Sequence, residues 1–266
     1  MQIHFYKFHG NGNDFIIVDN REDLVNLECK QIQNLCNRRF GIGADGLMLL
    51  NTSEKYDFEM VYYNSDGKLS SMCGNGGRCI AAFAKFLGII DNKTIFEAID
   101  GEHKAIINNY NPGEKVWNIS LQLSNVLEVE KNEEYYFLNT GSPHYVEFVD
   151  NVAEINVVLE GKKTRYNERF APDGTNVNFV EKNEERIFVR TYERGVEDET
   201  LSCGTGVAAS AIAFFYESGK SNINVHTTGG DFEVIFKHNH KDNQDRFTDI
   251  WLIGPATLVF EGEVFF

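Results

Sequence analysis

The sequence lacks any strongly basic cluster. Among its 266 residues, 40 Asp and Glu side chains outnumber 25 Lys and Arg side chains, so the formal net charge is −15. Proteins that bind nucleic acid or anionic membranes gather lysine and arginine into surface patches. The charge balance therefore argues against nucleic acid and against a membrane surface as partners.

Long apolar runs are also missing. No stretch approaches the roughly 18 consecutive apolar residues of a membrane-spanning helix, and residues 1–7 do not form the apolar region of a secretory signal. We therefore expect a cytoplasmic protein. Its 42% hydrophobic content is enough for two packed cores in a chain of this length.

Cysteine is scarce, and it occurs in an odd number. The five cysteines do not form a disulfide framework of the secreted kind, and their spacing is not that of a zinc site. The P-loop, Gly-x-Ser-x-Gly and His-Glu-x-x-His motifs are absent too. We expect no metal, and we expect three of the cysteines to pack in cores: Cys29, Cys36 and Cys79.

One cysteine motif is present twice. Residues 71–76 read Ser-Met-Cys-Gly-Asn-Gly, and residues 201–206 read Leu-Ser-Cys-Gly-Thr-Gly, an offset of 203 − 73 = 130. An apolar stretch follows each copy, at residues 80–87 and 207–216, and a glycine lies at or soon after its end. The pattern predicts two buried central helices, each with a cysteine at its N-terminus.

A position at a helix N-terminus affects the reactivity of the two cysteines. A helix N-terminus offers unpaired N–H groups and a partial positive charge, which favour a thiolate and bind a carboxylate. Such surroundings can lower a thiol pKa from about 8.5 to roughly 3.5–7.5. Cys73 and Cys203 are therefore interpreted as an acid/base pair, although buried structural cysteines are the simpler alternative.

The 130-residue repeat extends beyond the cysteines. Residues 14–18, 37–40 and 60–64 match segments 130 positions later, which indicates two homologous domains in tandem. A polar run at residues 238–245 is interpreted as an insertion in the second copy.

Most of the remaining apolar or alternating segments are short and lie between Gly, Asn and Asp turns, which favours strands. We expect an α+β fold in which each pseudo-symmetric domain is a curved mixed β-sheet wrapped round its central buried helix. The expected strands are residues 15–18, 46–50, 58–63, 95–99, 117–123, 145–148, 176–180, 187–192, 232–236 and 250–260.

The two halves differ at positions close to the predicted site. Asn64 corresponds to Arg194, Gly46 to Asn176, and residues 13–14 to Pro-His at 143–144. Unlike partners around a pseudo-twofold site suit a substrate whose two ends must be told apart, although drift between duplicated halves is as good an explanation of any one pair.

Six motifs together resemble the diaminopimelate epimerase family, at residues 9–15, 41–46, 64–67, 73–79, 193–195 and 203–206. The resemblance implies two similar α+β domains that close over a substrate, with the last strands returning to the first domain. We place the N-terminal epimerase domain at residues 1–118 together with 254–266, and the C-terminal domain at 119–253.

The resemblance also implies an activity. Members of the family are isomerases that interconvert LL- and meso-diaminopimelate without pyridoxal phosphate or any other cofactor, for lysine and peptidoglycan precursor synthesis. It further implies a homodimer with a small-molecule amino-acid substrate.

The family's site residues carry over to matching positions. Cys73 and Cys203 become the catalytic thiols, and His144 a secondary site residue. The α-carboxylate would be held by Gly74, Asn75, Gly204 and Thr205, and the rest of the substrate by Asn13, Asn64, Asn176, Glu193 and Arg194. Two positions depart from the usual pattern: Asn11 replaces an apolar residue, and Ser142 replaces an Asn found in many members.

Other functions compete with this one. A proline-type racemase would share the cysteine pair, but Asn64, Glu193 and Arg194 favour a longer amino acid with a charged far end. A thiol redox protein or an inactive binding module is the alternative from another class. Glycines and carboxylate-binding donors around both thiols argue against a purely redox role.

Overall fold

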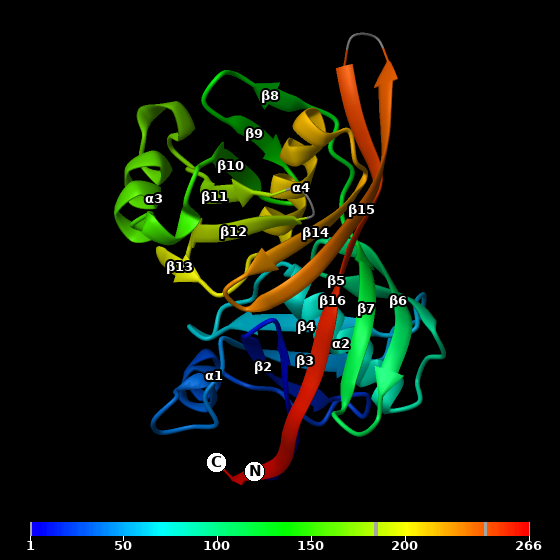
Figure 1. Ribbon diagram of the computed structural model, residues 1–266. Helices are drawn as coiled ribbons and strands as arrows, with labels where there is room; N and C mark the ends of the chain where they lie inside the picture. Colours follow the sequence, from blue (N-terminus) through cyan, green and yellow to red (C-terminus); the bar gives the residue numbers. More distant parts are fainter. Residues whose placement is uncertain (1, 184–185, 242–243, 266) are drawn as a thin grey trace. The chain divides into compact units, whose positions relative to one another are not determined.

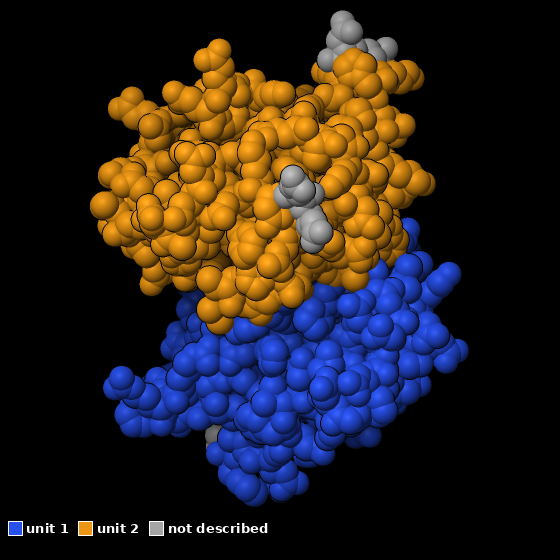
Figure 2. Space-filling model, viewed as in Figure 1, with its two compact units in different colours: residues 1–121, 254–266 blue, residues 122–253 orange. Residues whose placement is uncertain are grey.

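A computed structural model describes residues 2–183, 186–241 and 244–265. The chain divides into two compact units, residues 1–121 with 254–266 and residues 122–253 (Figure 2). The long C-terminal strand β16 (Gln244–Phe265) contributes to both, because its first part lies in unit 2 and its last part in unit 1.

Unit 1 is a mixed sheet that closes on itself. Its strands follow the order β1-β2-β3-β4-β5-β6-β7-β16, and β16 also pairs with β1. The β2–β3 and β4–β5 pairs are parallel. The elements are β1 (Gln2–Gly10), β2 (Asn13–Asp19), α1 (Cys29–Cys36), β3 (Gly46–Asn51), β4 (Glu59–Asn64), α2 (Gly74–Phe86), β5 (Lys93–Ala98), β6 (Gly101–Asn111) and β7 (Val116–Gln122).

Helix α2 forms the core of unit 1. Every residue from Gly74 to Ala84 is buried, and the helix contacts β1, β2, β3 and β6 (Figure 1). A helix that is apolar on nearly every side must be enclosed, so the sheet wraps round it.

Unit 2 repeats this plan around α4. Its strands follow the order β16-β15-β14-β12-β11-β10-β9-β8, with β13 beside β12 and with parallel β10–β11 and β12–β14 pairs. The elements are β8 (Val129–Lys131), β9 (Tyr136–Asn139), β10 (Pro143–Phe148), η1 (Val152–Glu154), α3 (Val157–Arg165), η2 (Glu168–Phe170), β11 (Asn176–Lys182), β12 (Arg186–Glu193), β13 (Asp198–Thr200), α4 (Gly204–Ser218), β14 (Asn222–Thr227) and β15 (Gly230–Lys241).

The two units confirm the predicted fold class, since each is a mixed sheet around one buried helix. Helix α4 contacts the strands from β9 to β12 as well as β14 and β15. It ends at Gly219, whose φ of 68° is the left-handed conformation that glycine adopts without strain.

Several elements differ from the expectation. Cys29 is exposed rather than packed in a core, because it begins α1, whose buried side consists of Ile32, Leu35 and Cys36. Cys36 and Cys79 are buried as expected. The polar run at 238–245 lies in the arms of β15 and β16, with residues 242 and 243 outside the described residues.

No described helix is long and apolar enough to cross a membrane.

Candidate active site

Cys73 lies directly before α2 as its N-cap residue. Its backbone is extended, and its Sγ accepts a hydrogen bond of 3.1 Å from the Gly76 N–H. A side chain at Gly76 would place its Cβ 3.2 Å from this sulfur, so glycine leaves room for the thiol. The first N–H groups of a helix have no acceptor within the helix, which makes this end suited to an anion.

Two asparagines surround the Cys73 thiol. The Asn13 amide donates through Nδ2 to Asp45 Oδ2 at 2.7 Å, which turns its Oδ1 toward Cys73 Sγ at 3.8 Å. The same Oδ1 accepts a hydrogen bond from Asn75 Nδ2 at 3.5 Å. The structure thus brings three predicted site residues together in unit 1.

Arg78 also belongs to this group of residues, although the motif at residues 73–79 that contains it predicts no role for it. Its fully buried guanidinium donates from Nη2 to the Oδ1 atoms of Asn11 and Asn75, both at 2.9 Å, and from Nη1 to the Gly74 carbonyl at 3.2 Å. Burial lowers the pKa of Arg78 to about 10, which still leaves it charged at neutral pH. It fixes the amide of Asn75, so that Asn75 Nδ2 faces Asn13.

The same arginine explains the unusual Asn11. Asn11 is buried with a φ of 52°, a left-handed conformation that asparagine tolerates better than most residues. Its side-chain oxygen would be a costly buried acceptor without the Arg78 guanidinium.

An ion cluster supports the strand that carries Asn13. Asp14 lies 2.7 Å from Lys7 Nζ and accepts two hydrogen bonds from Arg38, which also reaches Asp45 at 2.7 Å. Burial raises the pKa of Asp14, but the hydrogen bonds from Arg38 and Lys7 outweigh it and bring the pKa to about 2. Asp14 is therefore ionised at neutral pH.

Cys203 is the N-cap residue of α4 and is buried. Its Sγ lies 3.6 Å from the hydroxyl of Thr205, and Thr205 lies 2.9 Å from Nε2 of His144. Burial and the nearby Arg194 charge lower the pKa of His144 to about 3, so that its ring is neutral. The structure thus joins His144, Thr205 and Cys203 in unit 2.

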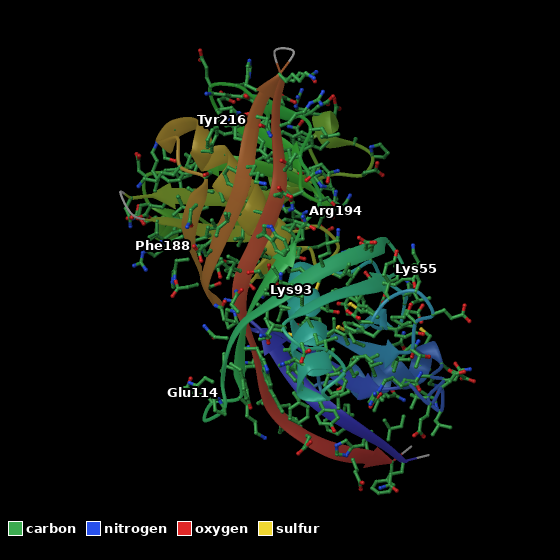
Figure 3. The ribbon with its side chains drawn as sticks, turned by 90° about the vertical axis from the view of Figure 1, so that its right-hand side faces the viewer. Lys55, Lys93, Glu114, Phe188, Arg194 and Tyr216 are labelled. Carbon is green, nitrogen blue, oxygen red and sulfur yellow. The ribbon has the colours of Figure 1, made fainter. Side chains whose placement is uncertain are left out.

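Asn176 and Arg194 form a second polar group in unit 2. The Arg194 N–H donates to Asn176 Oδ1 at 2.8 Å, and Asn176 Nδ2 donates to Ser142 Oγ at 2.9 Å. The Arg194 guanidinium reaches the same Ser142 oxygen at 3.4 Å. Ser142, the second unusual position, therefore accepts from both residues. Figure 3 labels Arg194, which follows the end of β12.

The remaining predicted residues lie at helix and strand ends. Asn64 is the exposed last residue of β4 and pairs with Gly46, and Glu193 is the last residue of β12. Gly74 and Gly204 are the buried first residues of α2 and α4.

A cavity of about 660 Å³ in unit 2 is lined by residues of η1, β12, β13 and β14 and by residues next to them, and none of the predicted site residues lines it. Among the described residues, no group of three or more His, Cys, Asp or Glu side chains could hold a metal ion.

Comparisons with known proteins point to one family. The family model for diaminopimelate epimerase matches residues 5–116 and 136–259. The diaminopimelate epimerase of Flavobacterium psychrophilum is 52% identical over 260 residues, covering 96% of this chain and 98% of the relative. That of Chlorobaculum tepidum is 39% identical, with coverage of 96% and 98%.

Solved structures at low identity share the fold. A PhzF-family phenazine biosynthesis protein of Bacillus anthracis aligns with a TM-score of 0.77 at 15% identity, covering all of both chains. A hydroxyproline epimerase from Agrobacterium vitis aligns with a TM-score of 0.70 at 14% identity, covering 99% of this chain and 92% of that one.

Proposed function

We propose a two-cysteine mechanism for this chain, which belongs to the diaminopimelate epimerase family and is an isomerase. Its substrate is diaminopimelate, and Cys73 and Cys203 are the groups that exchange the α-proton. One observation carries the proposal: each cysteine is the N-cap of the buried helix at the centre of its unit.

Inversion of the α-carbon needs two groups on opposite faces. One cysteine, as a thiolate, removes the α-proton, and the other, as a thiol, delivers its proton to the opposite face. The product leaves the two sulfurs with their protonation exchanged, so no net proton or electron is consumed. The proposal requires the two thiols to face each other when substrate is bound.

The carbanion formed between these steps needs stabilisation. The first N–H groups of α2 and α4, with the side chains of Asn75 and Thr205, are donors for the α-carboxylate as its charge grows. Gly74 and Gly204 begin these helices and let their backbone approach the substrate. The fixed amide of Asn75 supports this role, since a preorganised donor need not turn during the reaction.

The far end of the substrate would be read by residues that differ between the halves. Arg194 pairs with the distal carboxylate, because a guanidinium fork matches a carboxylate in two parallel hydrogen bonds. Its anchoring by Asn176 and Ser142 supports this assignment. The other residues proposed to contact the substrate are Asn13, Asn64 and Glu193, with His144 acting indirectly.

The reaction would need no cofactor and would serve lysine and peptidoglycan precursor synthesis in the cytoplasm. We also propose a homodimer, and two domains with the boundaries given above. The resemblance supports these points.

Epimerisation in deuterated water tests the mechanism. The unaltered protein should replace the α-proton of LL-diaminopimelate by deuterium, whereas Cys73→Ala and Cys203→Ala should each lose activity by about 10²–10⁴-fold or more. Cys29→Ser, at an exposed position, is the matched control and should retain full turnover. Near-normal turnover by either alanine variant would refute the two-base mechanism.

A further inference from the structure

A hydrogen-bond chain in unit 2 leads from a buried amide to the second thiol. We propose that Asn178 and His144 hold the Thr205 hydroxyl as a hydrogen-bond donor to Cys203 Sγ, which makes His144 a positioning residue. The inference rests on the proposed role of Cys203.

The hydrogen-bond chain starts at Asn178, and the orientation of the Asn178 side-chain amide is fixed by its other partners. Its Nδ2 lies 2.8 Å from the Tyr145 backbone carbonyl, which can only accept a hydrogen bond. Its Oδ1 accepts from the Thr191 hydroxyl at 3.0 Å. The second hydrogen of Nδ2 therefore points to Nδ1 of His144, 3.1 Å away.

This orientation determines the tautomer of His144. Nδ1 accepts a hydrogen bond from Asn178 and so carries no proton, and the buried ring is neutral. A neutral imidazole with a bare Nδ1 carries its proton on Nε2. That Nε2–H donates to Thr205 Oγ1 at 2.9 Å.

The last link is the Thr205 hydroxyl. Its oxygen accepts from His144, so its own hydrogen is directed to the next acceptor, Cys203 Sγ at 3.6 Å. A donor of this kind stabilises a thiolate relative to a thiol, because it bonds more strongly to the charged form.

This row of hydrogen bonds exists in the second half of the repeat only. At the 130-residue offset, Asp14 and Met48 replace His144 and Asn178, and the counterpart of Thr205 is an asparagine. The arrangement therefore distinguishes the two thiols.

Gly206 makes the arrangement sterically feasible. A Cβ at Gly206 would lie 2.4 Å from Asn178 Oδ1 and 3.3 Å from His144 Cε1. Glycine is therefore needed where α4 passes over the Asn178–His144 pair.

Nuclear magnetic resonance of the unaltered protein tests the tautomer directly. Two-bond ¹H–¹⁵N correlations of histidine-labelled protein, assigned by the loss of one ring in His144→Gln, should show a protonated Nε2 and a bare Nδ1 at pH 7. A protonated Nδ1 or an imidazolium would overturn the proposal.

The pH dependence of alkylation tests the effect on sulfur. In Thr205→Val the midpoint for iodoacetamide labelling of Cys203, followed by peptide mass spectrometry, should rise by about one pH unit. The labelling midpoint of Cys73 in the same sample should not move. In the separate variant Thr205→Ser, which keeps the hydroxyl, the Cys203 midpoint should equal that of the unaltered protein. Equal shifts of both thiols, or no shift, would overturn the proposal.

The substitution Asn178→Asp should reverse the tautomer of His144. A carboxylate at position 178 accepts a hydrogen bond from Nδ1–H, so the neutral ring keeps its proton on Nδ1. Nε2 then accepts from the Thr205 hydroxyl, which turns that hydroxyl away from Cys203. The Cys203 midpoint should then rise as in Thr205→Val, and an unchanged midpoint with a reversed tautomer would refute the link. Neither measurement needs turnover, so an inactive protein with these properties would refute the proposed function and not this chain of hydrogen bonds.

Discussion

At the scale of single residues, the first-half site depends on a buried cation. The Arg78 guanidinium joins the side chains of Asn11 and Asn75 to the start of α2. The planar fork reaches both amides at once, which a single ammonium group on a flexible stem does not reproduce.

Arg78→Lys should therefore lower the free energy of unfolding by about 2 kcal/mol, because buried amide oxygens lose charged partners. It should also lower kcat, since the Asn75 amide is no longer held. Urea unfolding and steady-state kinetics measure the two effects. Arg169→Lys, at an exposed ion pair with Glu130, is the matched control and should change both little. Normal stability and kcat in Arg78→Lys would contradict this role.

Arg194 carries the prediction about substrate choice. Arg194→Met should reduce kcat/KM for diaminopimelate on the order of 10²–10³-fold, because the distal carboxylate loses a charged partner. Lysine, which lacks that carboxylate, should be a poor substrate of the unaltered protein and should be affected far less by the substitution. Equal turnover of lysine, proline and diaminopimelate would instead favour a general racemase.

At the scale of elements, the ion cluster beside β2 makes stability depend on pH. The pKa of Asp14 is about 2 in the folded chain, against 3.8 ordinarily. A carboxylate with a depressed pKa stabilises the fold fully above its unfolded pKa, and this stabilisation is lost as pH falls through the folded pKa.

Asp14→Asn should accordingly cost about 2 kcal/mol or more at pH 7, and the difference should shrink below about pH 4 and nearly disappear near pH 2. Chemical unfolding at several pH values measures this, with Asp91→Asn, at an exposed position, as the control. A difference that stays constant from pH 7 to pH 2 would show that Asp14 acts by packing and not by charge.

Helices α2 and α4 could be predicted because their patterns are local and occur twice. All expected strand segments lie largely within strands of the structure, but the expectation missed β1, β6, β8, β9, β13 and β14. Lys7 in β1 is buried because it pairs with Asp14. The alternation of polar and apolar residues in the sequence does not reveal this burial. In β6, buried residues are few, and most of the strand is polar.

The candidate site could be predicted only where its residues lie in contiguous motifs. The cysteines and their flanking residues form contiguous motifs. Arg78 and Asn178 act through partners 67 and 13 positions away in sequence, Asn11 and Thr191. Such pairings exist only once the strands have their register, so the motif alone could not assign those roles.

At the scale of the whole molecule, the two-cysteine mechanism requires close approach of the thiols. If the proposed mechanism holds, two sulfurs that serve one α-carbon would come within reach of a disulfide, whose Cα atoms lie roughly 4.4–6.8 Å apart. Mild oxidant should therefore inactivate the protein by linking Cys73 to Cys203, and reductant should restore activity.

Peptide mapping of the oxidised protein identifies the linkage, and Cys29→Ser should behave as the unaltered protein does. Inactivation with Cys73 linked to Cys79, or with no linkage, would speak against facing thiols.

Strand β16 also constrains how the chain folds during synthesis. Unit 1 closes only when residues 254–265 pair with β1 and β7, yet the ribosome makes β1 first and β16 last. The sheet of unit 1 therefore stays incomplete while all of unit 2 is translated. Folding cannot proceed domain by domain from the N-terminus, and the unit that carries the first thiol is completed last.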